Sequence, residues 1–201
     1  KDKNIIFDLL TCDDASFEKG GHYLALKEKE YPTSFLYVGN FRAVKGVDIL
    51  QQAFKKYRDE LGGKWKLICT GNGELKGLLE DESNIELKGF SSQKELVSLC
   101  SEVGCFILPS RHDQWGVVVH EFAAASIPLL LSENVGAKST FFIENYNGIS
   151  FSDNSVDGLA YAMLELSEKP VCDLLRMSLN SEILSKRISP STSAANFVSV
   201  L

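Results

Sequence analysis

The stretch from Cys105 to Ser132 limits the possible folds of this chain more than any other part of its sequence. It reads CFILPSRHDQWGVVVHEFAAASIPLLLS. An apolar run at 105–108 is followed by a polar loop, by a segment with helical spacing at 117–125, and by a second apolar run at 128–131. A strand, a helix and a second strand joined in this way form the βαβ unit of parallel sheets. Ligands bind such sheets at the carboxyl ends of strands, close to helix N-termini.

The same alternation continues on both sides of this stretch. It predicts an α/β fold, a doubly wound, Rossmann-like open parallel sheet with helices on both faces. The predicted strands are 35–38, 65–70, 85–87, 105–108, 128–131 and 148–151. The predicted helices are 22–30, 47–61, 74–79, 93–102 behind a Ser92 cap, 117–125, 136–143, 155–166 and 170–187.

Composition supports one globular domain, or one domain with an appendage. The chain has 201 residues, of which 44% are hydrophobic and 24% charged, as in soluble globular proteins. We assign 1–33 to a linker or leader, 34–188 to the sheet domain and 189–201 to a C-terminal tail. A formal net charge of −6 gives no basic surface for nucleic acid. No run approaches the roughly 18 apolar residues of a membrane span, so we expect no transmembrane segment.

Cysteine and histidine spacing gives no metal motif. The five cysteines are an odd number without a Cys-x-x-Cys pair, which predicts buried free thiols in a reducing cytoplasm. No histidine stands at zinc-ligand spacing with a cysteine pair.

The loop after the first strand, GNFRAVKG at 39–46, combines two glycines with Arg42 and Lys45. Amides at a helix start and two cations suit a phosphate group. The alternative is an ordinary turn with solvated cations, and for this loop alone we favour it. The loop is neither a Walker A motif nor a complete Gly-x-Gly-x-x-Gly fingerprint.

The loop at 110–116 brings two acids near another helix start. Asp113 and Glu121 stand eight positions apart, one ahead of the helix and one within it. Either both acids face one cleft, or Asp113 is a surface acid in the loop and Glu121 lies on the solvent-exposed face of the helix. The spacing gives the two interpretations about equal weight. The amides of 116–118 would point at an anion. A Ser110–His112–Asp113 triad is a remote alternative, because no Gly-x-Ser-x-Gly elbow is present.

The turn at Gly89 and Phe90 follows the third predicted strand. An aromatic ring and open backbone groups at this end of the sheet suit a base. Phe90 as a core residue is the alternative, and without other information the better one.

Together these loops resemble the carboxy-terminal, donor-binding domain of the retaining glycosyltransferases of family 4, the glycosyl transferases group 1, which have the GT-B fold. The similarity runs over 35–165. Its motifs come in the family's order: FLYVGNFRAVKGVDIL, LICTGNGEL, IELKGFSSQKELVSLCSEVGCFILPS, DQWGVVVHEFAAASIPLLLS and GAKSTFFIENYNGISF. One motif alone is weak, whereas five in register are specific.

The resemblance implies roles for the loop residues. Asp113 would reach the donor sugar, Glu121 would bind the nucleotide ribose, and Lys45 would neutralise the diphosphate, so these are the candidate catalytic residues. The implied donor-binding residues are Gly39, Asn40, Arg42, Lys45, Gly89, Phe90, Gly116, Val117, Val118 and Glu121.

The chain departs from the family pattern at three positions. Asp113 stands where the family usually has Glu, and is one methylene shorter. Asn40 stands where the family commonly has Arg, with Arg42 two residues later. Ser126 stands where the family usually has Gly. The sequence does not decide whether Arg42 replaces the phosphate contact of the usual arginine at position 40.

The implied function is hexosyl transfer, with retention, from a UDP- or GDP-linked sugar without a metal or other cofactor. The acceptor, a sugar or a lipid-linked glycan, would bind an N-terminal domain that this chain is too short to contain, so we expect the isolated domain to be inactive. One alternative is a degenerate, non-catalytic interaction module. A weaker one is a sugar-nucleotide epimerase, for which only His112 offers a cleft histidine. The common family setting is polysaccharide biosynthesis, in the cytoplasm or peripherally at the inner membrane face.

Overall fold

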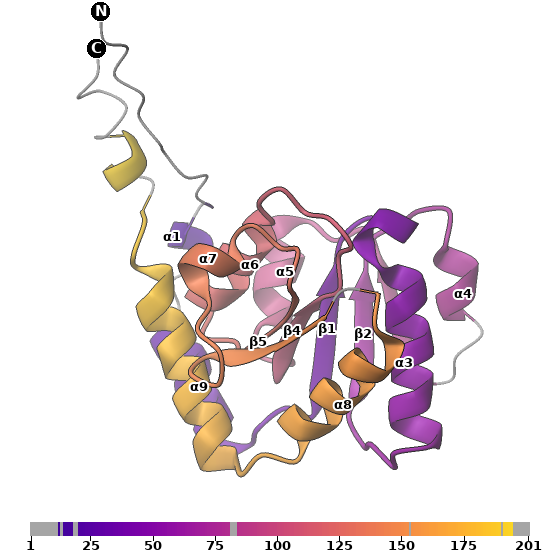
Figure 1. Cartoon of the computed structure of the whole chain (residues 1–201). Helices are drawn as coiled ribbons and strands as arrows, with labels where there is room; N and C mark the ends of the chain where they lie inside the picture. Colours follow the sequence, from indigo (N-terminus) through magenta and orange to yellow (C-terminus); the bar gives the residue numbers. More distant parts are fainter. Residues whose placement is uncertain are drawn as a thin grey trace, which may run out of the picture.

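The computed structural model of the chain describes residues 12, 14–17, 20–80, 84–152, 154–189 and 191–194. Within these residues a parallel sheet of six strands has the order β3-β2-β1-β4-β5-β6 (Figure 1). This order confirms the predicted doubly wound, Rossmann-like fold. The strands are β1 (Ser34–Val38), β2 (Lys66–Thr70), β3 (Ile85–Gly89), β4 (Cys105–Leu108), β5 (Leu129–Ser132) and β6 (Gly148–Phe151).

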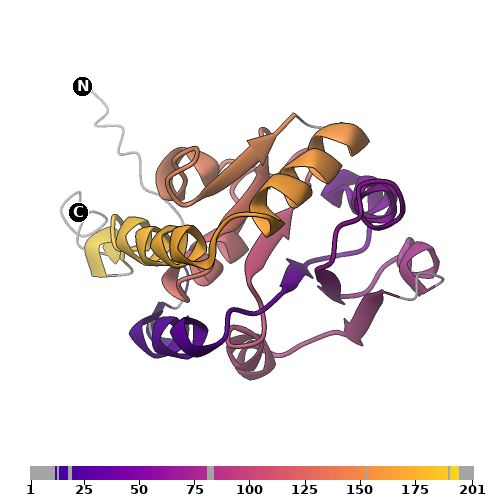
Figure 2. The same ribbon diagram turned by 90° about the horizontal axis from the view of Figure 1, so that it is seen from below.

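Helices lie on both faces of the sheet. α3 (Val47–Asp59) and α8 (Val156–Ser167) pack together on one side, and α2 (Gly20–Lys29) and α5 (Gln93–Leu99) lie on the other (Figure 2). None of the described helices is long and apolar enough to cross a membrane. The remaining labelled helices are α1 (Asp14–Phe17), η1 (Ala43–Lys45), α4 (Lys76–Glu80), α6 (Val117–Ala124), α7 (Lys138–Phe141) and α9 (Val171–Ser185), and residues 191–194 form one further short helical segment.

The middle of the sheet forms the core. Every residue of β4 and β5 is buried, because helices cover both faces of a doubly wound sheet. The Phe106 ring on β4 stacks on Phe122 of α6, with 4.5 Å between the ring centroids. Four of the five cysteines are buried free thiols, as predicted, whereas Cys172 on α9 is exposed. Burial raises the pKa of Cys69 and of Cys105.

The described part of the predicted leader packs against the sheet domain. Phe17 of α1 is fully buried and meets Phe122 edge to face. From α2, the Tyr23 hydroxyl donates to the carbonyl of Val97, and the buried Lys27 ammonium donates to the carbonyl of Ser126 at 3.0 Å. The division at residue 33 stays a prediction, as does the tail, whose last residues lie outside the described ones.

A crevice opens between β1 and β4. The two strands pair at Phe35–Cys105 and Leu36–Phe106, and their ladder stops two residues before either strand ends. The β1–β2 ladder, by contrast, continues to Val38. The strand order reverses between β1 and β4, which is where doubly wound sheets bind ligands.

Candidate functional site

A cavity of about 430 Å³ occupies this crevice at the carboxyl ends of β1 and β4. Seven of the eleven predicted site residues line it, whereas Arg42, Gly89, Phe90 and Glu121 do not. The seven are Gly39, Asn40, Lys45, Asp113, Gly116, Val117 and Val118. Val38, Leu108, Gln114 and Trp115 complete the lining.

An ion pair joins the two sides of the cavity. The Lys45 ammonium lies 2.7 Å from Oδ2 of Asp113, and the two side chains are 28% and 12% exposed. Both were predicted site residues, but their contact was not predicted. Lys45, the cation predicted to neutralise a diphosphate, therefore forms an ion pair with Asp113, the acid predicted to reach the sugar.

The backbone of Asp113 is fixed by the neighbouring β5–α7 loop. Its N–H donates to the carbonyl of Asn134 at 3.1 Å, and its own carbonyl accepts from the Gly136 N–H at 3.0 Å. Asp113 and Val135 form an isolated parallel bridge through these contacts. The loops that follow β4 and β5 therefore set the position of Asp113 at the cavity.

The close approach of the Asp113 loop and the β5–α7 loop requires a glycine at position 136, so replacing Gly136 should destabilise the fold. A Cβ at position 136 would lie 2.0 Å from the carbonyl oxygen of Gln114, which is backbone and cannot turn away. We expect Gly136→Ala to lower the free energy of unfolding by about 2 kcal/mol, measured by urea unfolding. Gly77→Ala is the control, because a Cβ there meets nothing within 4 Å. Equal effects of the two substitutions would contradict the tight contact.

The N-terminus of α6 is left open to the cavity. Gly116 forms its N-cap with φ 82°, contributes no capping side chain, and is followed by a first turn without acidic residues. By contrast, α5 has a Ser92–Glu95 capping box, as predicted for Ser92, and Ser155 caps α8. Helix-terminal N–H groups without a cap attract anions. Among these three helices, only the one at the crevice presents them.

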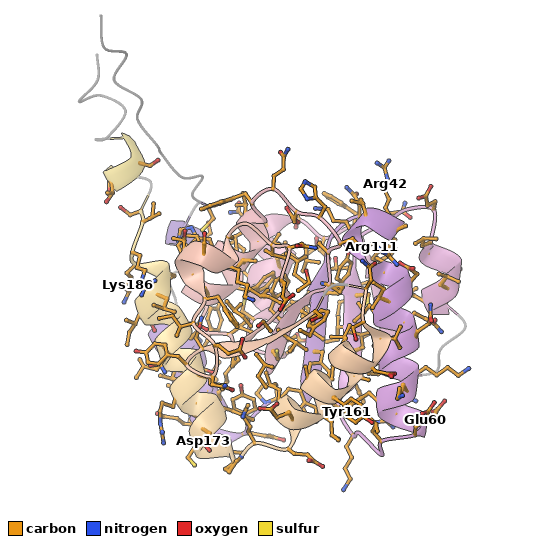
Figure 3. The ribbon with its side chains drawn as sticks, viewed as in Figure 1. Arg42, Glu60, Arg111, Tyr161, Asp173 and Lys186 are labelled. Carbon is orange, nitrogen blue, oxygen red and sulfur yellow. The ribbon has the colours of Figure 1, made fainter. Side chains whose placement is uncertain are left out.

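Asn40 and Arg42 do not supply a second cation to the cavity. Arg42 is exposed, and Figure 3 shows it pointing outward from its loop. Asn40 lines the cavity, and its carbonyl accepts a 2.9 Å hydrogen bond from the buried Tyr37 hydroxyl. Within the cavity lining, Lys45 is the only lysine or arginine.

The predicted ribose contact, Glu121, lies one helical turn beyond the cavity lining. It is half-buried and close to Cys100, whose pKa is raised to about 12 by burial, with a further contribution from the Glu121 charge. The structure therefore places Glu121 on the same helix as the open N-terminus, deeper along it.

The predicted base contact, Phe90, is 86% exposed beyond the end of β3, so the alternative of a core residue is wrong. Neighbouring strands are about 4.8 Å apart, which puts the end of β3 about 14 Å from that of β4. Gly89 has φ 68°, and its carbonyl accepts from the Gly71 N–H and the Thr70 hydroxyl.

A second cavity, of about 750 Å³, adjoins the first at Asp113 and Gln114. Most of its side chains are polar, and Lys138 lies 5.3 Å over the Phe142 ring. Its other lining residues are His112, Glu133, Asn134, Val135, Gly136, Lys138, Ser139, Phe142 and Glu144. Gln114 and Trp115 were not among the predicted site residues, although both belong to the loop at 110–116.

The Ser–His–Asp triad alternative is wrong. The Ser110 hydroxyl is buried and has no hydrogen-bond partner among the described residues, so no base activates it. Asp113 pairs with Lys45. Within the described residues, no three His, Cys, Asp or Glu side chains gather as a metal site, and transfer without a metal stays a prediction.

Comparisons with known proteins agree on one family. The family model for glycosyl transferases group 1 matches residues 25–182. An uncharacterised glycosyltransferase of Methanocaldococcus jannaschii is 33% identical over 162 residues, which are 77% of this chain and 43% of that protein. The chain thus spans less than half the length of this relative.

Solved structures share the fold at low sequence identity. Anabaena HepE, in complex with UDP and glucose, has a TM-score of 0.77 at 16% identity, covering 96% of this chain and 56% of that one. The C-terminal domain of a glycosyl transferase group 1 protein from Francisella tularensis has a TM-score of 0.70 at 15% identity, covering 87% and 96%. From the family match over most of its length, the chain belongs to the glycosyl transferases group 1 family.

Proposed function

We propose that this chain is the donor-binding half of a retaining glycosyltransferase whose donor is a nucleotide diphosphate-sugar. The observation that carries the proposal is the convergence of Lys45, Asp113 and the open N-terminus of α6 on one cavity at the sheet's switch point. The N-terminal, acceptor-binding domain would lie outside this chain, which agrees with its 43% coverage of a relative.

The diphosphate is the group that these residues suit best. It carries several negative charges, and in sugar transfer it gains more as the leaving group. Lys45 and the first amides of α6 would stabilise that charge where it develops. Their positions are set by folding, so little reorganisation is needed when the bond breaks.

The transferred sugar would lie toward Asp113. This carboxylate stands where the two cavities meet, and amide, carboxylate and hydroxyl side chains line the second one. Such groups hydrogen-bond sugar hydroxyls. The nucleoside would extend the other way, along the carboxyl ends of β1 and β2 toward the exposed Phe90 ring. Retention of the anomeric configuration rests on the family resemblance.

The second candidate is a degenerate module that has kept the sheet and lost donor binding. Two observations favour it: the cavity lining has one cation, and that cation is paired with Asp113. The two candidates differ in whether the chain binds a nucleoside diphosphate.

Calorimetric titration of the 201-residue chain with UDP and with GDP separates them. We expect one of the two to bind with a Kd between about 10 and 100 µM, a binding free energy of about 5.5 to 7 kcal/mol. Affinity that is unchanged between EDTA and Mg²⁺ would support binding without a metal. The nucleosides uridine and guanosine are controls that lack the diphosphate. No heat with either nucleotide at millimolar concentrations would contradict the donor-domain proposal and favour the degenerate module.

A further inference from the structure

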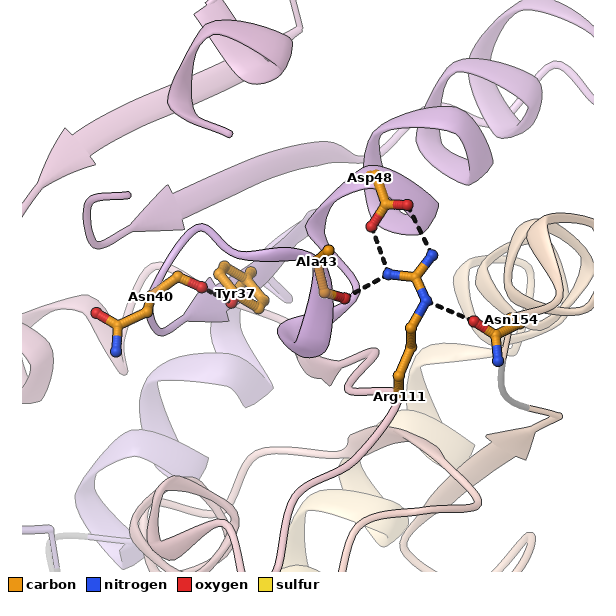
Figure 4. A network of polar contacts seen from close by, with 6 residues as sticks. All are labelled: Tyr37, Asn40, Ala43, Asp48, Arg111 and Asn154. Atoms are coloured by element: carbon orange, nitrogen blue, oxygen red, sulfur yellow. Dashed lines mark hydrogen bonds and ion pairs between the residues drawn. The ribbon is translucent and has the colours of Figure 1, made fainter. Parts of the chain in front are cut away.

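Arg111 links the loops at three strand ends. It follows β4 two residues before Asp113, and its guanidinium forms a forked ion pair with Asp48 in the first turn of α3, at 2.6 and 2.7 Å (Figure 4). Nη1 also donates to the carbonyl of Ala43, and Nε donates to Oδ1 of Asn154 at 2.5 Å. Ala43 belongs to the η1 turn after β1, and Asn154 follows β6.

These contacts use most of the guanidinium's hydrogen-bonding capacity. Arginine has five N–H donors, and four of them are directed at Asp48, Ala43 and Asn154. The Asp48 hydrogen bond raises the pKa of Arg111, and Arg111 lowers the pKa of Asp48. A forked contact to a phosphate would require Arg111 to leave Asp48. We therefore do not regard Arg111 as a substitute for the family's phosphate-binding arginine.

Arg111 holds the η1 turn, which carries Lys45. The η1 turn is short, with Lys45 N–H donating to the carbonyl of Arg42 and Gly46 N–H donating to that of Ala43. Arg111 binds this turn twice, through the Ala43 carbonyl and through its own N–H, which donates to Val44 at 3.0 Å. A lysine side chain is long and flexible, so the place of its ammonium depends on a fixed backbone.

The same residue is tied to the Asp113 side of the cavity. Asn134, whose carbonyl holds the Asp113 N–H, also donates from its side chain to the Arg111 carbonyl at 3.1 Å. Arg111 therefore connects the turn that carries Lys45 with the loop residue that holds the backbone of Asp113. The forked geometry to Asp48 fixes the guanidinium better than a single contact would.

We propose that Arg111 is a positioning residue that sets Lys45 for the diphosphate, an inference that rests on the proposed function. It acts through the η1 turn and does not contact the ligand. Its removal would leave the fold in place and would let the turn move, so that Lys45 spends less time where the diphosphate binds.

A double-mutant cycle tests this role. We expect Arg111→Met to weaken binding of UDP or GDP, whichever the chain binds, about tenfold, and to have less than about a twofold effect when Lys45 is already methionine. Binding of the matching nucleoside should not change. Asp48→Asn should reproduce the loss because it removes the partner that orients Arg111, and Arg111→Lys should restore little because lysine lacks the fork.

Two results would overturn the proposal. Additive losses in the cycle would mean that Arg111 contacts the diphosphate itself, and an unchanged affinity in Arg111→Met would mean a structural role only. Arg176→Met is the matched control, because Arg176 pairs with Asp173 on α9, outside both cavities.

Hydrogen exchange separates this proposal from the proposed function. If the wild-type chain binds neither nucleotide, the donor-domain proposal fails, but the tie between Arg111 and the turn is still measurable without a ligand. We expect the Lys45 and Gly46 amides, bonded within the turn, to exchange faster in Arg111→Met than in wild type. Unchanged exchange at these amides would overturn the positioning role by itself.

Discussion

Replacing Lys45 with alanine is expected to weaken binding of UDP or GDP by about 100-fold, because a charge-assisted hydrogen bond contributes about 1.5 to 3 kcal/mol. The upper end of this range applies for a structural reason. The substitution removes the cation and also leaves Asp113, 12% exposed, as an unpaired carboxylate facing the diphosphate. Titration calorimetry measures the loss, and the matching nucleoside should bind as it does to wild type.

Asp113→Asn should change diphosphate affinity in the opposite direction. Asp113 pairs with the Lys45 ammonium at 2.7 Å, so a diphosphate must compete for that ammonium. Removing the Asp113 charge releases Lys45 and removes a repulsion, and we expect UDP or GDP to bind about threefold more tightly. The same substitution should impair sugar transfer by a complete enzyme, because Asp113 is our proposed sugar contact.

Lys186→Ala is the matched control for Lys45→Ala. Lys186 pairs with Glu182 at 2.8 Å near the end of α9, far from Arg42 and its loop in Figure 3. The Lys186→Ala substitution removes one positive charge and breaks one ion pair, and Lys186 lines neither cavity. Equal losses of affinity in both variants would show that net charge matters rather than the position of Lys45, and would contradict the site.

The sheet and the place of the cavity could be predicted because they depend on local patterns. Short apolar runs such as 105–108 become buried strands, and their alternation with helices leaves few topologies. Loops after neighbouring strands then meet at one edge, which brought the Lys45 loop and the Asp113 loop together. The Ser92 cap was predictable for the same reason, since its partner Glu95 is three residues away.

Contacts between distant side chains could not be predicted in this way. Lys45 and Asp113 are 68 positions apart, and Arg111 and Asp48 are 63 apart. Sequence spacing says which loops are neighbours but not which side chains point at each other. The orientation of Arg42 depends on the η1 turn, which has no helical or strand period.

The packing of α2 against the sheet domain could not be predicted from its composition. GGHYLALKEK shows no clear apolar face, and a lysine is rarely buried. The position of α2 is explained by Ser126, which follows the C-cap of α6 with φ 56°, a conformation that favours glycine. The Ser126 carbonyl accepts the Lys27 ammonium, and the Ser126 hydroxyl donates to Glu182. A glycine at position 126 could not make the hydroxyl contact with Glu182.

Replacing the buried Lys27 with methionine is expected to stabilise the chain at pH 7. Burial lowers the pKa of Lys27 to about 8, against 10.5 for an ordinary lysine, so keeping it charged costs roughly 3 kcal/mol. Methionine of similar length avoids this cost but loses the hydrogen bond to Ser126, about 1 kcal/mol. The net expectation is a gain of about 2 kcal/mol in the free energy of unfolding, measured with urea.

The pH dependence of this difference identifies its cause. Between pH 8 and 10.5 the folded chain has released the Lys27 proton and the unfolded chain still holds it, so the wild type becomes more stable as pH rises. The advantage of Lys27→Met should therefore be constant below pH 8 and shrink toward pH 10.5. Lys29→Met, at the exposed end of α2, is the control and should change stability by less than about 0.5 kcal/mol at every pH.

A loss of stability in Lys27→Met that does not vary with pH would contradict this account. It would mean that the ammonium gains more from its surroundings than burial removes. Those surroundings are the Ser126 carbonyl, the Tyr31 ring at 5.9 Å, and the Cys100 and Cys105 thiols. Ser126 follows α6, whose first turn lines the cavity. Measuring the nucleotide affinity of Lys27→Met therefore shows whether Lys27 contributes to the site as well as to stability. We expect that affinity to be unchanged.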